Sequence, residues 1–323
     1  MISRRTALIV IAMALSALNT SYAQSFPSRP VKIVLPQPPG TGPDVLARTL
    51  AEELAKDLGQ PVVVENRPGA NGSIAASYTI SQPADGHTLF LAGVSNMSWN
   101  PYLYRSLSYN PSRDLMGVAL LANTPFVTVV SPSLGVRTLE ELIKKAKAEP
   151  GGISFGSAGV GNSTHLSTEL LMARTGIQML HVPFSGRGGT TMYTGLLSGQ
   201  PSVLTSVPSD LVPLAKAGKV VPLAVSGEKR LMQLPAVPTF KELGFDMEIP
   251  GWYAIVARKG TPASVVERLN RAINAAMEGR GVRAYLDAQM LQSLKGDASE
   301  VDLWTRRDAD VWRPIINNLN IAN

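Results

Sequence analysis

The sequence reads VKIVLPQPPGTGPD from Val31 to Asp44, a short apolar run followed by a loop rich in proline and glycine. The apolar run predicts a buried β-strand. A helix should follow the loop, because apolar residues recur at helical spacing from Val45 to Leu58 and Gly59 then stops the pattern. A strand, a loop at its carboxyl end and a helix form the first part of a βαβ unit.

The same alternation continues along the chain. A second strand is expected at residues 61–65, a helix of small residues at about 70–81 and a third strand at 88–93. Two consecutive βαβ units predict a parallel sheet with right-handed crossovers.

A second alternating set follows this sheet. Its expected strands are 126–130, 153–156, 179–182, 203–205 and 221–225, and its expected helices are 138–148, 164–174, 189–197 and 209–217. A last strand at 252–257 and amphipathic helices from 262 onward complete the chain. Two α/β sets predict two lobes.

Residues 1–23 have the layout of a secretory signal peptide. Met1–Arg5 carries two arginines, Thr6–Leu18 is almost wholly apolar, and Ser21-Tyr22-Ala23 has small residues where a signal peptidase reads. The apolar run is too short for the ~30 Å hydrocarbon core of a bilayer. We therefore expect export to the periplasm and cleavage after Ala23.

The composition excludes several classes of function. The chain has 323 residues, 45% of them hydrophobic, so it can bury a core and is not a disordered tail. It has no cysteine, so disulfides, thiolate metal sites and a cysteine nucleophile are excluded. Aromatic residues make up 6%, and no basic run exceeds two residues, which argues against nucleic-acid binding. A diffuse net charge of +6 suits small anions better.

The motifs for catalysis and cofactor binding are weak. Ser154 lies in a Gly-x-Ser-x-Gly pattern, but it falls inside an expected strand and not at a strand-to-helix turn. The histidines, at 87, 165 and 181, are far apart in sequence and lack metal-site spacing. Neither a dinucleotide fingerprint nor a P-loop is present. No cofactor and no metal are therefore expected.

Loops rich in glycine, serine and threonine follow several expected strands and precede helices. They are Gly40-Thr41-Gly42, Ser157–Thr164 and Ser185–Gly189. Backbone N–H groups at helix N-termini favour anions, and ligands of open α/β sheets lie beyond the carboxyl ends of the strands. Three such loops from two lobes could close on one small anion, although glycine and serine also form ordinary turns and caps.

Longer strings resemble a known family. They are Pro36-x-Pro38-Pro39-Gly40-x-x-x-Asp44, Gly59 to Ala70 with its Glu65-Asn66-Arg67-Pro68-Gly69 core, Asn100-Pro101-x-Leu103-Tyr104, His165-Leu166, His181-Val182-Pro183-Phe184 and Leu234-Pro235-x-Val237-Pro238-Thr239. In these strings the mature chain resembles the periplasmic substrate-binding receptors of tripartite tricarboxylate transporters, also called Bug-type receptors.

The resemblance implies an α/β, two-lobed periplasmic-binding-protein fold of type II, the Venus flytrap, with two crossover strands. Lobe 1 would comprise residues 24–125 with 254–323, and lobe 2 residues 126–253. The crossing strands near 126–130 and 252–256 would then act as the hinge.

It also implies that a small carboxylate lies between the lobes. Carried over by position, the ligand-binding residues are Gly40, Thr41, Gly42, Asp44, Ser157, Gly161, Asn162, Ser163, Thr164, His165, Phe184, Ser185, Gly186, Arg187 and Ser206. Asp44 should orient its loop from behind, because a carboxylate facing a carboxylate ligand would repel it. Arg187 should either pair with a second ligand carboxylate or steer ligands from the rim of the cleft.

The chain departs from the family pattern at several of these positions. Thr41 replaces a usual glycine, Gln37 a usual aromatic residue, and Phe184–Arg187 a usual Tyr-Lys-Gly-Gly string. Ser206 stands where an acidic residue is common, which weakens the case for an amino-acid ligand.

These observations together favour a monomeric solute-binding receptor and not an enzyme. It would capture a small mono- or dicarboxylate, possibly aromatic, and deliver it to membrane transporter subunits. Two alternatives remain open at this point: a sensor subunit that presents ligand to a membrane kinase, and an exported serine hydrolase that uses Ser154.

Overall fold

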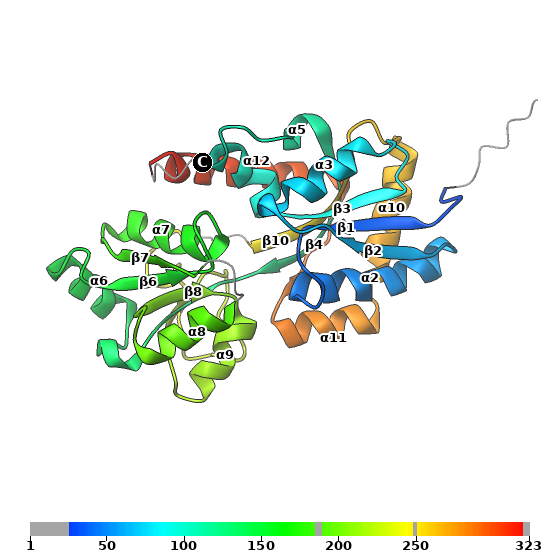
Figure 1. Ribbon diagram of the computed structural model, residues 1–323. Helices are drawn as coiled ribbons and strands as arrows, with labels where there is room; N and C mark the ends of the chain where they lie inside the picture. Colours follow the sequence, from blue (N-terminus) through cyan, green and yellow to red (C-terminus); the bar gives the residue numbers. More distant parts are fainter. Residues whose placement is uncertain (1–25, 185–188, 248–250, 319–323) are drawn as a thin grey trace, which may run out of the picture.

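The computed structural model describes residues 26–184, 189–247 and 251–318, and shows two α/β lobes side by side (Figure 1). Each lobe contains one mixed sheet. The strand order is β11-β4-β10-β3-β1-β2 in lobe 1 and β7-β6-β8-β5-β9 in lobe 2. The expected fold class, two α/β lobes of the periplasmic-binding-protein type, is therefore confirmed. Across the described ranges, no helix combines the length and apolar composition needed to cross a membrane.

Lobe 1 begins with the expected βαβαβ unit. Strand β1 (Val31–Leu35) lies parallel to both β2 (Val62–Asn66) and β3 (Thr88–Gly93). The helices of this lobe are α2 (Gly42–Leu58), α3 (Ser73–Ser81), α4 (Asn100–Leu103), α5 (Pro111–Asp114), α10 (Ala263–Ala276), α11 (Arg280–Gln289) and α12 (Ala298–Asn318). Helix α2 ends where expected, because Gly59 adopts a left-handed conformation with φ of 66°.

The longest strand in the described residues, β4 (Leu115–Thr124), was not predicted from the sequence. It pairs antiparallel with β10 (Gly251–Arg258), which is also antiparallel to β3, so the sheet is mixed and not wholly parallel. A short edge strand, β11 (Gln292–Ser293), completes the sheet beside β4. Strand β4 is apolar on both faces, and such a run does not show the alternation that marks a half-exposed strand.

Lobe 2 is built around β5 (Val127–Val130), which is antiparallel to both of its neighbours, β8 (Val203–Ser206) and β9 (Val221–Val225). The remaining elements are β6 (Ser154–Ser157), β7 (Leu180–Pro183), α6 (Leu139–Ala148), α7 (Ser163–Thr175), α8 (Gly189–Ser198) and α9 (Pro208–Lys216). Strand β6 is parallel to β7 and β8, as the alternating pattern predicts.

The chain crosses between the lobes next to the β4–β10 pair. It passes from β4 into β5 through Pro125 and Phe126, and β10 pairs with β4 from Gly251 onward. The segments expected to hinge lie almost wholly within paired strands of the two sheets. The division of the chain at 125/126 and 253/254 stays a prediction.

Helix α12 packs on β4 without room for a side chain at Gly117. A Cβ atom there would lie 2.2 Å from the carbonyl oxygen of Ala298 and 2.6 Å from Cβ of Val301. Val301 and Trp312 of the helix are fully buried. The glycine therefore fixes how closely α12 approaches the sheet.

Substituting Gly117 by alanine should lower the free energy of unfolding by about 1–3 kcal/mol, because overpacking forces α12 away from β4. Urea unfolding followed by circular dichroism measures this. Gly281→Ala is the matched control: its Cβ would meet only a Thr49 methyl at 3.2 Å, and alanine favours helix α11. Equal stability of Gly117→Ala and wild type would contradict the close approach.

Candidate ligand-binding cleft

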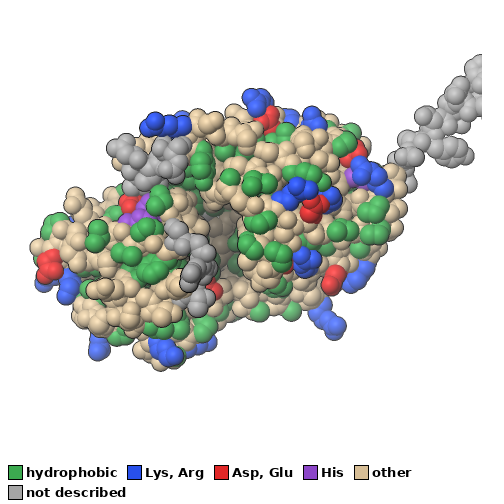
Figure 2. Space-filling model, viewed as in Figure 1, with side chains coloured by type: hydrophobic (Ala, Val, Ile, Leu, Met, Phe, Trp, Pro, Cys, Tyr) green, Lys and Arg blue, Asp and Glu red, His purple; other side chains and the backbone are tan. Residues whose placement is uncertain are grey.

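A groove separates the two lobes (Figure 2). It contains two adjoining cavities of about 260 and 250 Å³, which share Thr124, Val207 and Tyr253 as lining residues. We call them the first and the second cavity. Polar residues from both lobes line the first: Gln37, Asn71, Ser95, Asn96, Thr124, Asn162, Ser163 and Tyr253. Among the described lining residues of the first cavity none carries a formal charge.

An asparagine network shapes the lobe 1 wall of the first cavity. Asn96 Nδ2 donates to the carbonyl of Asn71 at 2.8 Å, and Asn71 Nδ2 donates to Oδ1 of Asn100 at 2.8 Å. Gly72 is required here, because its φ is 87° and a Cβ would lie 2.2 Å from Asn96 Nδ2. The sequence analysis missed these residues. The Glu65–Gly69 string, which leads directly into Asn71, was the available signal.

Asp44 is hydrogen-bonded to the first loop of lobe 1. Its carboxylate accepts the Gly40 N–H at 2.9 Å, both Nε and Nη2 of Arg48 at 3.0 Å, and Asn66 Nδ2 at 2.8 Å. Burial alone would raise the pKa of Asp44, but the bonds from Arg48, Gly40 and Asn66 outweigh it and lower the pKa to about 2. The carboxylate therefore holds the loop in place through its hydrogen bonds, and whether it acts from behind the loop stays a prediction.

Of the other predicted residues of this loop, Thr41 stabilises the loop and Gly42 lines the second cavity. Thr41 Oγ1 donates to the carbonyl of Pro38 at 2.8 Å. Gly42 lines the second cavity, and its carbonyl accepts a hydrogen bond from the Tyr285 hydroxyl at 2.5 Å. The first turn of α2 thus faces the cleft, while Thr41 and Asp44 organise the loop before it.

The predicted loop of lobe 2 leads into the N-terminus of α7. Asn162 caps this helix, because its Oδ1 accepts the Thr164 N–H at 3.0 Å, and Thr164 Oγ1 in turn accepts the Ala158 N–H at 2.8 Å. Asn162 and Ser163 line the first cavity. Ser157, Gly161, Thr164 and His165 are not among its lining residues.

An acidic side chain lines the second cavity. Asp210, in the first turn of α9, lines this cavity and accepts a hydrogen bond from the Tyr193 hydroxyl. Tyr193 also bonds to the buried Ser206 at 2.9 Å. Burial raises the pKa of Asp210. Ser206 supplies no acid, but Asp210, four residues later, places one in this cavity, so the serine at 206 does not by itself argue against an amino-acid ligand.

The remaining predicted positions lie near β7. The Phe184 N–H donates to the carbonyl of Ser157 at 2.8 Å, and its ring packs against Gly156 and Gly195, so it supports β6. Ser185, Gly186 and Arg187 lie outside the described residues. Ser154 Oγ accepts the Ser202 N–H at 3.3 Å, a contact within the sheet of lobe 2.

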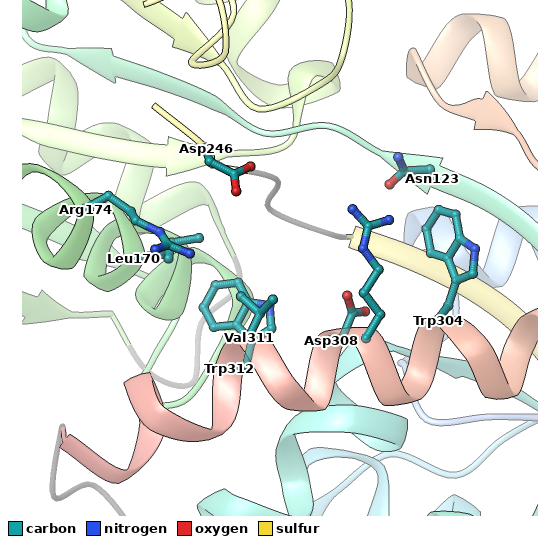
Figure 3. A pocket seen from close by; sticks show the side chains of 9 residues that line it. Asn123, Leu170, Arg174, Asp246, Trp304, Asp308, Val311 and Trp312 are labelled. Carbon is teal, nitrogen blue, oxygen red and sulfur yellow. The ribbon is translucent and has the colours of Figure 1, made fainter. Parts of the chain in front are cut away.

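A third cavity, of about 180 Å³, lies on the opposite face of the crossing strands (Figure 3). Asn123 lines this rear cavity, whereas Thr124 lines the cleft, and successive strand residues point to opposite faces. Side chains reach into it from α12 and from α7: Trp304, Asp308, Val311 and Trp312 from the first, Leu170 and Arg174 from the second. The rear cavity is therefore also bounded by both lobes.

Two α/β lobes, joined by crossing strands and enclosing polar cavities, define a solute-binding protein. The chain belongs to the family described as "Tripartite tricarboxylate transporter family receptor", whose model matches residues 46–321. The resemblance drawn from the sequence strings is thereby confirmed. Proteins of this family bind solutes and are not enzymes.

Several known proteins are similar to this chain. The BugT protein of Bordetella pertussis is 37% identical over 83% of this chain and 82% of its own length. A Pseudomonas sp. (strain P51) protein encoded between tcbD and tcbE is 36% identical over 98% of this chain and 94% of its own length. An R. palustris protein solved with adipate superposes with a TM-score of 0.79 at 31% identity, covering 92% of this chain and 99% of its own.

Other solved neighbours extend the comparison. MatC from Rhodopseudomonas palustris, with bound malate, superposes with a TM-score of 0.76 at 27% identity over 90% of this chain and all of its own. The periplasmic binding protein BugD superposes with a TM-score of 0.76 at 26% identity, covering 92% of this chain and 99% of its own.

The depressed pKa of Asp44 makes its stabilising effect depend on pH. Its folded pKa of about 2 lies below the usual value of about 4, so the ionised form stabilises the fold above about pH 4 and this contribution is lost as pH falls through about 2. The unfolding free energies of wild type and Asp44→Asn should therefore differ at neutral pH and approach each other over that window.

Urea unfolding at stepwise pH measures the effect. Asp310→Asn is the control for loss of a surface carboxylate, since that side chain is 77% exposed. A difference between wild type and Asp44→Asn that stays constant down to pH 2 would contradict the role of the ionised carboxylate.

Proposed function

We propose that this protein is a periplasmic receptor that captures a small carboxylate between its lobes and presents it to a tripartite tricarboxylate-type membrane transporter. The proposal includes export through residues 1–23, with cleavage after Ala23. The observation that carries it is the first cavity, where neutral polar groups of both lobes meet the N-terminus of α7.

The donors around this cavity suit a carboxylate. Helix α7 begins at Ser163, and helix N-termini carry a partial positive charge and free N–H groups. Asn71, Asn96 and Gln37 line the same space from lobe 1. A ligand bound here would therefore be held by N–H and O–H donors from both lobes. The adipate and malate bound by two similar proteins support this class of ligand.

The second cavity favours particular ligands within that class. Asp210 is its one charged lining residue in the described part of the chain. A second carboxylate placed against an ionised Asp210 would be repelled, whereas a hydroxyl or ammonium group could donate to it. Hydroxy acids and amino acids therefore belong in the ligand panel beside mono- and dicarboxylates.

A thermal-shift panel of carboxylates tests the proposed function. A true ligand at 100 times its Kd should stabilise the protein by roughly 2.7 kcal/mol, and matched amides that lack the carboxylate should not. A panel in which no carboxylate raises Tm would contradict carboxylate capture.

The same ligand should close the lobes. A bound molecule that contacts both walls stabilises the closed arrangement, so the radius of gyration from small-angle X-ray scattering should fall at saturation. The amide analogue of the ligand is the control. An unchanged radius with saturating ligand would contradict closure.

Asp44 should affect binding through its loop. Asp44→Asn keeps an acceptor for the Gly40 N–H and should weaken binding modestly, while Asp44→Ala removes it and should weaken binding more. Isothermal titration with the ligand from the panel gives both Kd values. Tighter binding in both variants would show instead that the acid faces the ligand.

A further inference from the structure

Two histidine rings are stacked beneath the ligand-facing loop of lobe 2. The centroids of His165 and His181 are 3.9 Å apart and their planes differ by 14°. Phe155 of β6 stacks on His181 at 4.8 Å. His165 is 2% exposed. Each ring also holds one end of the loop from Ser157 to Thr164, although neither lines the cavity.

His165 holds the C-terminal end of this loop. Its Nδ1 accepts the Gly161 N–H at 3.1 Å, so Nδ1 carries no proton, and the proton lies on Nε2, 3.3 Å from Glu169 Oε1. Gly161 has φ of 74° and directly precedes the helix cap Asn162. The orientation of the Val160–Gly161 peptide thus depends on an unprotonated Nδ1.

His181 holds the other end. Its Nε2 lies 2.6 Å from Ser157 Oγ, and this hydroxyl accepts the Gly159 N–H and donates to the Gly159 carbonyl, both at 3.1 Å. Ser157 is fully buried, so these contacts are shielded from water. The two rings therefore fix the peptides of Gly159 and Gly161 on either side of the loop.

We propose that His165 and His181 are positioning residues for the ligand-binding loop of lobe 2, and that the loop keeps its binding shape only while the stacked pair is uncharged. The proposal rests on the proposed function, because it takes this loop to be part of the carboxylate site. It does not require either ring to touch the ligand.

The surroundings decide where a proton would go. Burial and the neighbouring His165 lower the pKa of His181 to about 4. In the described part of the chain, the titratable groups in contact with the pair are the rings themselves and Glu169 of α7; β6 contributes Phe155 and Ser157. Glu169 Oε1 lies 3.3 Å from His165 Nε2 and would pair with a doubly protonated His165 ring.

A proton on His165 Nδ1 turns the acceptor of the Gly161 N–H into a second donor. The two N–H groups then oppose each other, and the Gly161 peptide must move. Carboxylate affinity should therefore fall in acid. A buried positive charge that acted only through its field would do the opposite and raise the affinity, so the sign of the effect separates the two.

Isothermal titration with malate and adipate as probes, from about pH 8 to about pH 5.5, tests the proposal. Wild type should lose about tenfold in affinity, the equivalent of one hydrogen bond to a buried group. His165→Asn retains a side-chain acceptor but cannot titrate, so its profile should be flat relative to wild type. His165→Phe keeps the stack without an acceptor and should bind weakly at every pH.

The third histidine provides the control. His87 lies in lobe 1, where it accepts the Ser28 N–H, and His87→Gln should follow the wild-type profile. Ionisation of the probe affects all variants alike. Superimposable profiles of wild type and His165→Asn, or an affinity that rises in acid, would overturn the proposal.

A measurement without ligand separates this proposal from the proposed function. In ¹⁵N-glycine-labelled protein, the amide resonances of Gly159 and Gly161 should shift with pH in wild type and not in His165→Asn. Titrating amides without binding of any carboxylate would refute the function and keep the positioning role. Binding with amides that do not titrate would refute the positioning role alone.

Discussion

The pairing of β4 with β10 is the constraint on which the molecule depends. Both strands belong to the lobe 1 sheet, and Thr124, the last residue of β4, pairs with Gly251, the first residue of β10. The cleft cavities open on one face of this pair and the rear cavity on the other. Helix α12 covers the pair from the rear and approaches closely enough to exclude a side chain at Gly117. Hydrogen bonds of one antiparallel ladder thus set the floor of the ligand site and the relation between the lobes.

Local patterns in the sequence predicted most elements, because each is encoded by neighbouring residues. The Thr138–Glu141 capping pair begins α6 as expected, with Thr138 Oγ1 accepting the Glu141 N–H at 3.1 Å. Strand β4 was not predicted, because a strand that is buried on both faces has no alternation of apolar and polar residues. Its antiparallel partner β10 is more than a hundred residues away, and no local signal reveals such a pairing.

The site was predictable where a loop meets a helix and unpredictable where distant side chains meet. Asn162 and Ser163 line the first cavity because they start α7, which the sequence pattern located. The Asn71–Asn96 network joins residues from different loops and has no signature in either one. Asp210 was not predicted, because the family pattern places the acid near Ser206 at the end of β8, whereas Asp210 lies in the first turn of α9. The sequence located the elements that carry His165 and His181 but did not predict that their rings stack. This stacking depends on the register of β7 beside β6.

The tryptophans of this chain have an unusual distribution. Its four indoles gather along α12: Trp304 and Trp312 belong to the helix, Trp99 lies 4.9 Å from Trp312 between ring centroids, and Trp252 lies 6.5 Å from Trp304. Trp304 and Trp312 line the rear cavity, whose opposite wall is α7 of lobe 2. A rotation of the lobes would change the polarity around these indoles, although the proposed ligand site lies on the other face. The intrinsic fluorescence of the native chain is therefore a reporter of lobe rotation that needs no attached dye and no contact with ligand.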